Sequence, residues 1–195
     1  MSNGSPTRQN FLVLQIDVKK HTEWLEENET EKHPARKVFG ECIISSMEHC
    51  GFLKFSWAGD GGVFVLSSDG RTNYDIIVDK ADKIYEIFEL WQIEYAHVNA
   101  DRLGLRVSAD VMPIIVDGDP SFWTSVRLNK FLKSERRISE MGFAITGEIK
   151  NNLSNEKRRR FDGLDGYHGY KRVIGIPPNS ITIWYDSNHR TELTD

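Results

Sequence analysis

One apolar run near the N-terminus constrains the fold of this chain more than any other segment. Residues 11–16 read Phe-Leu-Val-Leu-Gln-Ile, and Asp17 follows them. A nearly continuous apolar run of this length is typical of a strand that is buried on both faces and therefore lies inside a sheet. We expect a central strand over residues 11–16 that ends at Asp17, with helices covering the sheet.

The segments after this run alternate between helical and strand patterns. Helical patterns cover residues 22–27, 34–50, 73–97 and 125–138. Strand patterns cover residues 52–57, 63–66, 103–112, 142–146, 171–176 and 180–185, and a charged loop is expected over residues 157–169. Thr22 is the expected N-cap of the first helix, and Pro34 is the expected first residue of the second. The sequence Gly-Asp-Gly-Gly over residues 59–62 predicts a hairpin turn.

The order of these elements brings two distant aspartates together. The first half of the chain reads strand, helix, helix, strand, strand, helix, strand. A right-handed crossover places the first two strands parallel, and the third strand then pairs antiparallel between them. Asp17 at the end of the first strand and Asp60 in the hairpin turn are therefore expected at the same edge of the sheet.

Two carboxylates at one sheet edge suit a site for Mg²⁺ or Mn²⁺ and a triphosphate. These cations bind carboxylate oxygens and share their remaining coordination with phosphates and water. A pair of such ions activates an attacking oxygen and stabilises a leaving one. The backbone N–H groups of residues 18–22, at the start of a helix, would cradle a phosphate. Either aspartate alone is also explained as a strand-end or turn residue, but the two together favour a site.

Composition limits the partners of the chain. Its net charge of −4 argues against a general nucleic-acid-binding protein. No apolar run is long enough to span a membrane, and the N-terminus lacks a signal-peptide core. Cys42 and Cys50 have the pattern of buried thiols in a reducing compartment. We expect a cytoplasmic protein with a flexible leader over residues 1–9 and a single catalytic domain over residues 10–195.

Several segments resemble the class III adenylate and guanylate cyclases in order and spacing. Asp-Val-Lys-Lys-His-Thr over residues 17–22 resembles the family's Asp-Ile-Val-Gly-Phe-Thr, and residues 59–62 resemble its Gly-Asp-Gly hairpin. Leu-Arg-Val-Ser-Ala-Asp-Val-Met over residues 105–112 is similar to the family strand Leu-Arg-Ile-Gly-Ile-His-Thr-Gly, and two late segments resemble its last strands. The resemblance implies a ferredoxin-like α/β (α+β) fold, with a mixed, mostly antiparallel sheet flanked by helices.

The resemblance also implies active sites that are shared between the subunits of a homodimer. One subunit would bind two Mn²⁺ or Mg²⁺ ions through Asp17, Val18 and Asp60. Its partner would contribute the catalytic pair Asn129 and Lys133, which are one helical turn apart.

Two positions depart from the family at the triphosphate. Lys133 stands where the family has arginine, and a lysine cannot bind phosphate as a bidentate fork. Ile174 stands where the family has its triphosphate-binding lysine, so Lys171 is expected to take over that contact. Thr22, which matches the threonine of the first motif, is also expected at the substrate.

The base-reading residues of the purine cyclases are absent. Ser56 stands where adenylate cyclases carry lysine and guanylate cyclases carry glutamate, and Trp123 is a candidate to narrow the pocket until only a single-ring base fits. This pattern looks like the pyrimidine cyclases of bacterial Pycsar antiphage systems. That likeness implies conversion of UTP to 3′,5′-cyclic UMP and diphosphate, with a separate effector protein that binds the cyclic nucleotide.

Other interpretations stay open at this point. The chain could be a cytidylate cyclase or a purine cyclase with an altered base pocket. It could also be a catalytically dead module that binds nucleotide, although the retention of both Asp17 and Asp60 speaks against this. A polymerase palm domain uses similar carboxylates, but the acidic charge and short length of the chain disfavour it.

Overall fold

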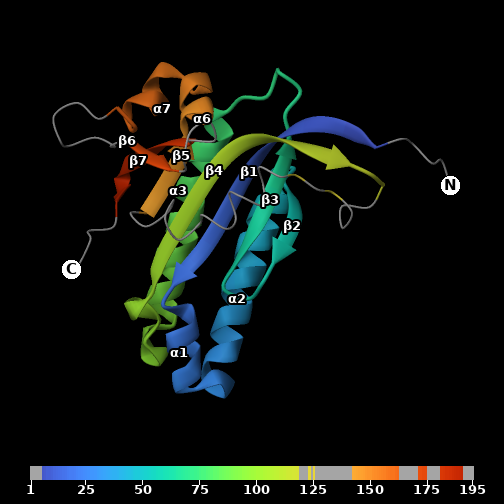
Figure 1. Ribbon diagram of the computed structural model, residues 1–195. Coiled ribbons are helices and arrows are strands. Elements are labelled where there is room, and N and C mark those ends of the chain that lie inside the picture. Colours follow the sequence, from blue (N-terminus) through green and yellow to red (C-terminus); the bar gives the residue numbers. More distant parts are fainter. Residues whose placement is uncertain are drawn as a thin grey trace.

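A seven-stranded sheet forms the centre of the computed structural model, which describes residues 6–118, 123, 125, 142–162, 171–174 and 181–190. The helices α2 and α3 run along the sheet (Figure 1). The strands are β1 (Thr7–Lys19), β2 (Leu53–Trp57), β3 (Gly61–Ser67), β4 (Gly104–Val116), β5 (Gly142–Thr146), β6 (Lys171–Ile174) and β7 (Ile181–Arg190). The helices are α1 (His21–Glu27), α2 (Glu29–Glu48), α3 (Asp75–Glu94), α6 (Gly147–Asn152) and α7 (Asn155–Arg159), with 3₁₀ turns at Ala96–Val98 and Ala100–Arg102.

Strand β1 lies inside the sheet, as the apolar run predicts. The strand order is β2-β3-β1-β4-β5-β7-β6, and β1 pairs antiparallel with both β3 and β4. Strand β2 also pairs antiparallel with β3, so β1 and β2 are parallel with β3 between them. Of the strand pairs in the described part of the chain, only β4 and β5 are parallel. The predicted order of the first half and the mixed, mostly antiparallel sheet are confirmed.

The two faces of the sheet pack against different partners. Leu12, Leu14 and Ile16 belong to the main core, which also contains buried residues of α2 and α3, and we call this side the helix face. The alternate residues Phe11 and Val13 belong to a second cluster, built from buried residues of β1, β3, β4, β5 and β7. We call this side the second face. Because successive side chains of a strand point to opposite faces, every polar residue of β1 can be assigned to one of them.

Two local expectations at the end of β1 are wrong. The strand continues to Lys19, because β4 pairs with it as far as Gly104, so Asp17 lies within β1. Thr22 is not a helix cap, because α1 already begins at His21. The N-cap of α1 is Lys20, which adopts a left-handed conformation with φ of 61°. This residue turns the chain out of the strand.

The helix boundaries differ from expectation at two further places. Pro34 lies inside α2, which begins at Glu29 because the side chain of Asn28 accepts a hydrogen bond from the N–H of Glu31. The first three residues of the charged loop expected over residues 157–169 belong to helix α7, for which the side chain of Ser154 provides the N-cap. The helix expected over residues 125–138 lies outside the described residues apart from Ser125. None of the described helices is long and apolar enough to cross a membrane.

Candidate metal and nucleotide site

The hairpin between β2 and β3 holds Asp60 against β1. The backbone N–H of Val18 donates a hydrogen bond of 3.0 Å to the carbonyl oxygen of Asp60, and Asp17 is the direct Cα partner of Gly61. A Cβ atom on Gly61 would lie 2.1 Å from the carbonyl oxygen of Ile16, so only glycine allows the two strands to approach in this way. The fold therefore places Asp17 and Asp60 on adjacent segments at one end of β1.

The side chain of Asp17 lies on the second face of the sheet. Its neighbours Ile16 and Val18 are both part of the helix-face core, so the alternation of the strand directs Asp17 to the other side. There Arg106, its direct partner on β4, donates from Nη1 to Oδ2 of Asp17 at 3.0 Å. The side chains of Asp17 and Arg106 keep 22% and 19% of their surface exposed, so both remain accessible to a ligand.

Asp60 borders a small cleft at the start of α1. The cleft has a volume of about 260 Å³ and is lined by His21, Thr22, Leu25, Glu26, Glu29, Ala58 and Asp60. The Nδ1 atom of His21 lies 3.9 Å from Oδ2 of Asp60. Burial lowers the pKa of His21 below its ordinary value, although the charge of Asp60 acts in the opposite direction. A neutral imidazole and several carboxylates therefore surround this cleft, which suits a cation.

Of the residues expected at the substrate, Thr22 lines this cleft, whereas Ser56, Trp123 and Lys171 are not among its lining residues. Ser56 is exposed on β2, and Lys171 begins β6, so these two residues lie on opposite edge strands of the sheet. The ring of Trp123 packs on Phe11 with centroids 5.2 Å apart. Phe11 is six residues before Asp17 on the same strand, which corresponds to about 20 Å. Asn129 and Lys133 lie outside the described residues.

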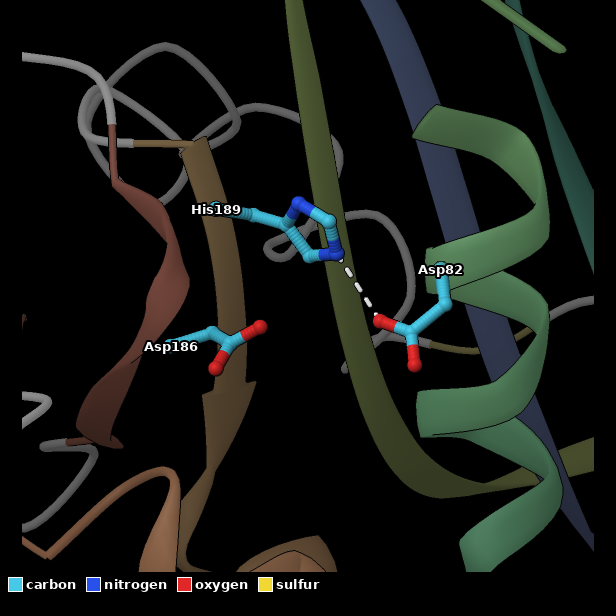
Figure 2. A group of neighbouring side chains, drawn as sticks. All are labelled: Asp82, Asp186 and His189. Carbon is cyan, nitrogen blue, oxygen red and sulfur yellow. Dashed lines mark hydrogen bonds and ion pairs between the residues drawn. The ribbon is translucent and has the colours of Figure 1, made fainter. Parts of the chain in front are cut away.

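A second group of possible metal ligands lies between α3 and β7 (Figure 2). The ligand atoms of Asp82, Asp186 and His189 are all within 4.8 Å of one another, and His189 Nε2 is 2.8 Å from Oδ1 of Asp82. However, the guanidinium of Arg160 already binds both carboxylates, at 2.7 and 2.8 Å to the oxygens of Asp82 and 3.0 Å from Nε to Oδ1 of Asp186. Because arginine supplies the positive charge here, we interpret this group as an ion-pair network.

The overall architecture can be compared with solved structures, although no protein-family model and no curated protein matches the chain. The guanylyl cyclase Cya2 superposes with a TM-score of 0.71 at 13% identity, covering 96% of this chain and 94% of that chain. The adenylyl cyclase CyaB from P. aeruginosa gives 0.63 at 11% identity, with 98% of both chains covered. This chain has the fold of a nucleotidyl cyclase catalytic domain.

A third structure supports the same assignment of the cyclase fold. An adenylate/guanylate cyclase/hydrolase from Silicibacter pomeroyi superposes with a TM-score of 0.63 at 18% identity, covering 92% of this chain and 97% of that chain. Each of the three superpositions covers more than nine tenths of both chains. At 11–18% identity the likeness establishes the fold alone.

Proposed function

We propose that this protein is a divalent-metal-dependent nucleotidyl cyclase, which converts a nucleoside triphosphate into a 3′,5′-cyclic nucleotide and diphosphate. The observation that carries the proposal is the position of Asp17 against the Asp60 hairpin, within a fold that adenylyl and guanylyl cyclases share. The two side chains keep 22% and 35% of their surface exposed. They therefore present accessible carboxylate oxygens, the donors that Mg²⁺ and Mn²⁺ prefer.

The residues around the two aspartates suit this chemistry. Asp17, Asp60 and the backbone carbonyl of Val18 would hold two Mn²⁺ or Mg²⁺ ions. Such ions supply Lewis acidity at the attacking 3′-hydroxyl and at the leaving diphosphate. Arg106, which lies 3.0 Å from Asp17, would contact a phosphate oxygen and align the triphosphate, because a guanidinium makes strong hydrogen bonds to phosphate. The neutral His21 beside Asp60 would help to orient that carboxylate.

We further propose that the other half of each active site comes from a second copy of the chain. In one chain, Lys171 on the edge strand β6 is separated from Asp17 on β1 by strands β4, β5 and β7. A substrate bound at Asp17 would therefore meet Lys171 only on another subunit. Asn129 and Lys133 are proposed to act from that same partner, at the ribose and the phosphates.

Mixing two inactive variants tests the shared active site. Asp60→Ala removes a metal ligand and Asn129→Ala removes a partner-side residue, so each homodimer is expected to be inactive. In a 1:1 mixture about half of the dimers are mixed, and each mixed dimer has one intact site, so roughly a quarter of wild-type activity should return. Native mass spectrometry with one variant uniformly labelled with ¹⁵N confirms that mixed dimers form, because the two substitutions alone leave the chains almost equal in mass. If they form without any recovery of activity, the site is not shared between subunits.

The proposed substrate is UTP, with cyclic UMP as a second messenger in bacterial antiphage defence and a separate effector as its receptor. The support is the short hydroxyl of Ser56, which is exposed on β2 and cannot reach as far as the lysine or glutamate that reads a purine. CTP is the next candidate. A purine substrate is also consistent with the structure, because the solved neighbours are described as adenylyl and guanylyl cyclases.

Incubation with each of the four nucleoside triphosphates and Mn²⁺ tests both the activity and the base. Mass spectrometry of the products is expected to show cyclic UMP as the main product. Trp123→Ala is expected to raise the turnover of ATP and GTP relative to UTP, because it removes the bulk that Trp123 of a second copy of the chain is proposed to bring to the base. Preferential turnover of ATP or GTP by the wild type would refute the pyrimidine assignment and leave the cyclase assignment in place. Binding of nucleotide with no cyclic product from any of the four would instead indicate a catalytically dead module.

A further inference from the structure

Several buried polar residues interrupt the apolar second face of the sheet, among them Asp110, which is the direct Cα partner of Val13. Gln15 on β1 and Ser108 on β4 are direct Cα partners and are only 5% and 1% exposed. Their neighbours along the strands on this face include Val13 and Met112, which belong to the second apolar cluster. Residues of this kind are rarely buried unless their polar atoms have partners.

Some of these polar atoms lack partners. Oε1 of Gln15, Oγ of Ser108 and Nε of Arg106 are buried and have no hydrogen-bond partner among the described residues. Leaving such an atom buried and unpaired costs about 1–3 kcal/mol. An apolar side chain of similar size would avoid this cost at both positions. The unpaired oxygens of Gln15 and Ser108 therefore do not stabilise the fold. Orphaned atoms of this kind point to a ligand that supplies the missing partners.

The register of the sheet connects this pair to the residue expected to face the base. Ser56 is paired with Val63, Val63 with Gln15, and Gln15 with Ser108. Directly paired residues point to the same face of a sheet, so all four lie in one row on the second face. Gln15 is two strands away from Ser56, which corresponds to about 10 Å. Val63 provides an apolar platform between two polar positions.

We propose that Gln15 and Ser108 form a subsite that reads the hydrogen-bonding edge of the nucleobase. This inference rests on the proposed cyclase function and adds two residues to it. The orphaned carbonyl of Gln15 accepts an N–H of the base, and the hydroxyl of Ser108 donates to or accepts from the adjacent polar atom of the base. A base that lies over Val63 would have Ser56 on one side and this pair on the other.

Binding of nucleotides that cannot cyclise tests this subsite without relying on turnover. Isothermal titration calorimetry with the 3′-deoxy forms of UTP, CTP, ATP and GTP in the presence of Mn²⁺ gives the base preference of each variant. Gln15→Leu and Ser108→Ala are each expected to weaken the best-bound nucleotide about tenfold or more, and to reduce its preference over the other three. Gln9→Leu is the matched control on the same strand, because Gln9 is exposed.

Folding stability separates this role from a structural one. Since the orphaned atoms stabilise nothing in the unliganded chain, urea unfolding of Gln15→Leu and Ser108→Ala should show unchanged or increased stability. A loss of stability combined with an unchanged order of base preference would overturn the subsite. If the wild type binds and cyclises a nucleotide, and both variants keep the base preference of the wild type, the subsite alone is refuted. If the wild type neither binds nor cyclises any of the four, the cyclase function and the subsite fall together.

Discussion

Alanine in place of Asp17 or Asp60 is expected to lower cyclase turnover by about a hundredfold or more, because each carboxylate contributes several kcal/mol of transition-state stabilisation through the metals. The expected loss is in kcat, since the metals act on the attacking and leaving oxygens. The measurement is cyclic nucleotide formed per unit time at saturating substrate and Mn²⁺. Asp17→Asn and Asp60→Asn preserve the shape of each side chain and are expected to lose nearly as much.

Controls must show that these losses do not come from unfolding. Asp17 pairs with Arg106, and the two side chains keep only 22% and 19% of their surface exposed, so Asp17→Ala leaves a largely buried guanidinium without this partner and is expected to lose some stability. Asp17→Asn keeps an acceptor oxygen for Arg106, and circular dichroism should show that all four variants are folded at the temperature of the assay. Asp101→Ala, which changes an exposed aspartate on a 3₁₀ turn, should keep full turnover. Variants of Asp17 and Asp60 that fold normally and retain near-wild-type kcat would show that these carboxylates do not hold the catalytic metals.

Local sequence signals were sufficient to predict the frame of this site. The apolar run over residues 11–16 identified β1 as an interior strand, and the glycines around Asp60 identified the hairpin. Both features depend on residues that are close together in the chain, where pattern and backbone freedom decide the structure. A single topological rule, the right-handed crossover, then sufficed to place Asp60 next to Asp17.

The residues that complete the site could not be found in the same way. Arg106 reaches Asp17 across 89 positions of sequence, and Gln15 meets Ser108 only because β1 and β4 pair in one particular register. A sequence pattern predicts strands but not the register in which they pair. A shift of the register by two residues in either direction keeps the same face apolar, so the pattern cannot exclude it. The sequence marks His21 in one way only, as a histidine at a position where the family motif has phenylalanine. This difference does not reveal that His21 lies close to Asp60.

The ion-pair network at Arg160 was likewise invisible in the sequence, where it appeared as part of a basic run. In the structure Arg160 follows α7 and joins Asp82 of α3 to Asp186 of β7, which are brought together by the packing of α3 against the sheet. The ring of His189 stacks on Tyr85 with centroids 4.0 Å apart and also contacts Asp82. This network connects the C-terminal strand to the helix layer, and it lies on the helix face, whereas Asp17 is on the second face.

Asp186→Ala is expected to cost about 3–5 kcal/mol of folding stability, because it leaves a largely buried guanidinium without one of its two carboxylates. Asp186 is fully buried as a side chain, and Arg160 keeps only 15% of its side chain exposed. Urea unfolding followed by far-UV circular dichroism measures the loss. Asp79→Ala is the matched control on α3. The side chain of Asp79 is 56% exposed and pairs with Lys157, so the loss of this ion pair is expected to cost about 1 kcal/mol or less of folding stability. Equal losses for the two variants would show that the network adds nothing beyond a surface ion pair.

The same network also predicts how stability depends on pH. Burial alone would raise the pKa of Asp82, but hydrogen bonds from Arg160 and His189 lower it overall, well below its ordinary value. A carboxyl whose pKa is lower in the folded state than in the unfolded state stabilises the fold fully above the unfolded pKa. That contribution is lost as the pH falls through the folded pKa. Stability from this group should therefore decline only below about pH 4. Asp82→Asn should flatten the acid limb of the stability curve in this range, and an acid limb unchanged by the substitution would show that Asp82 does not contribute to it.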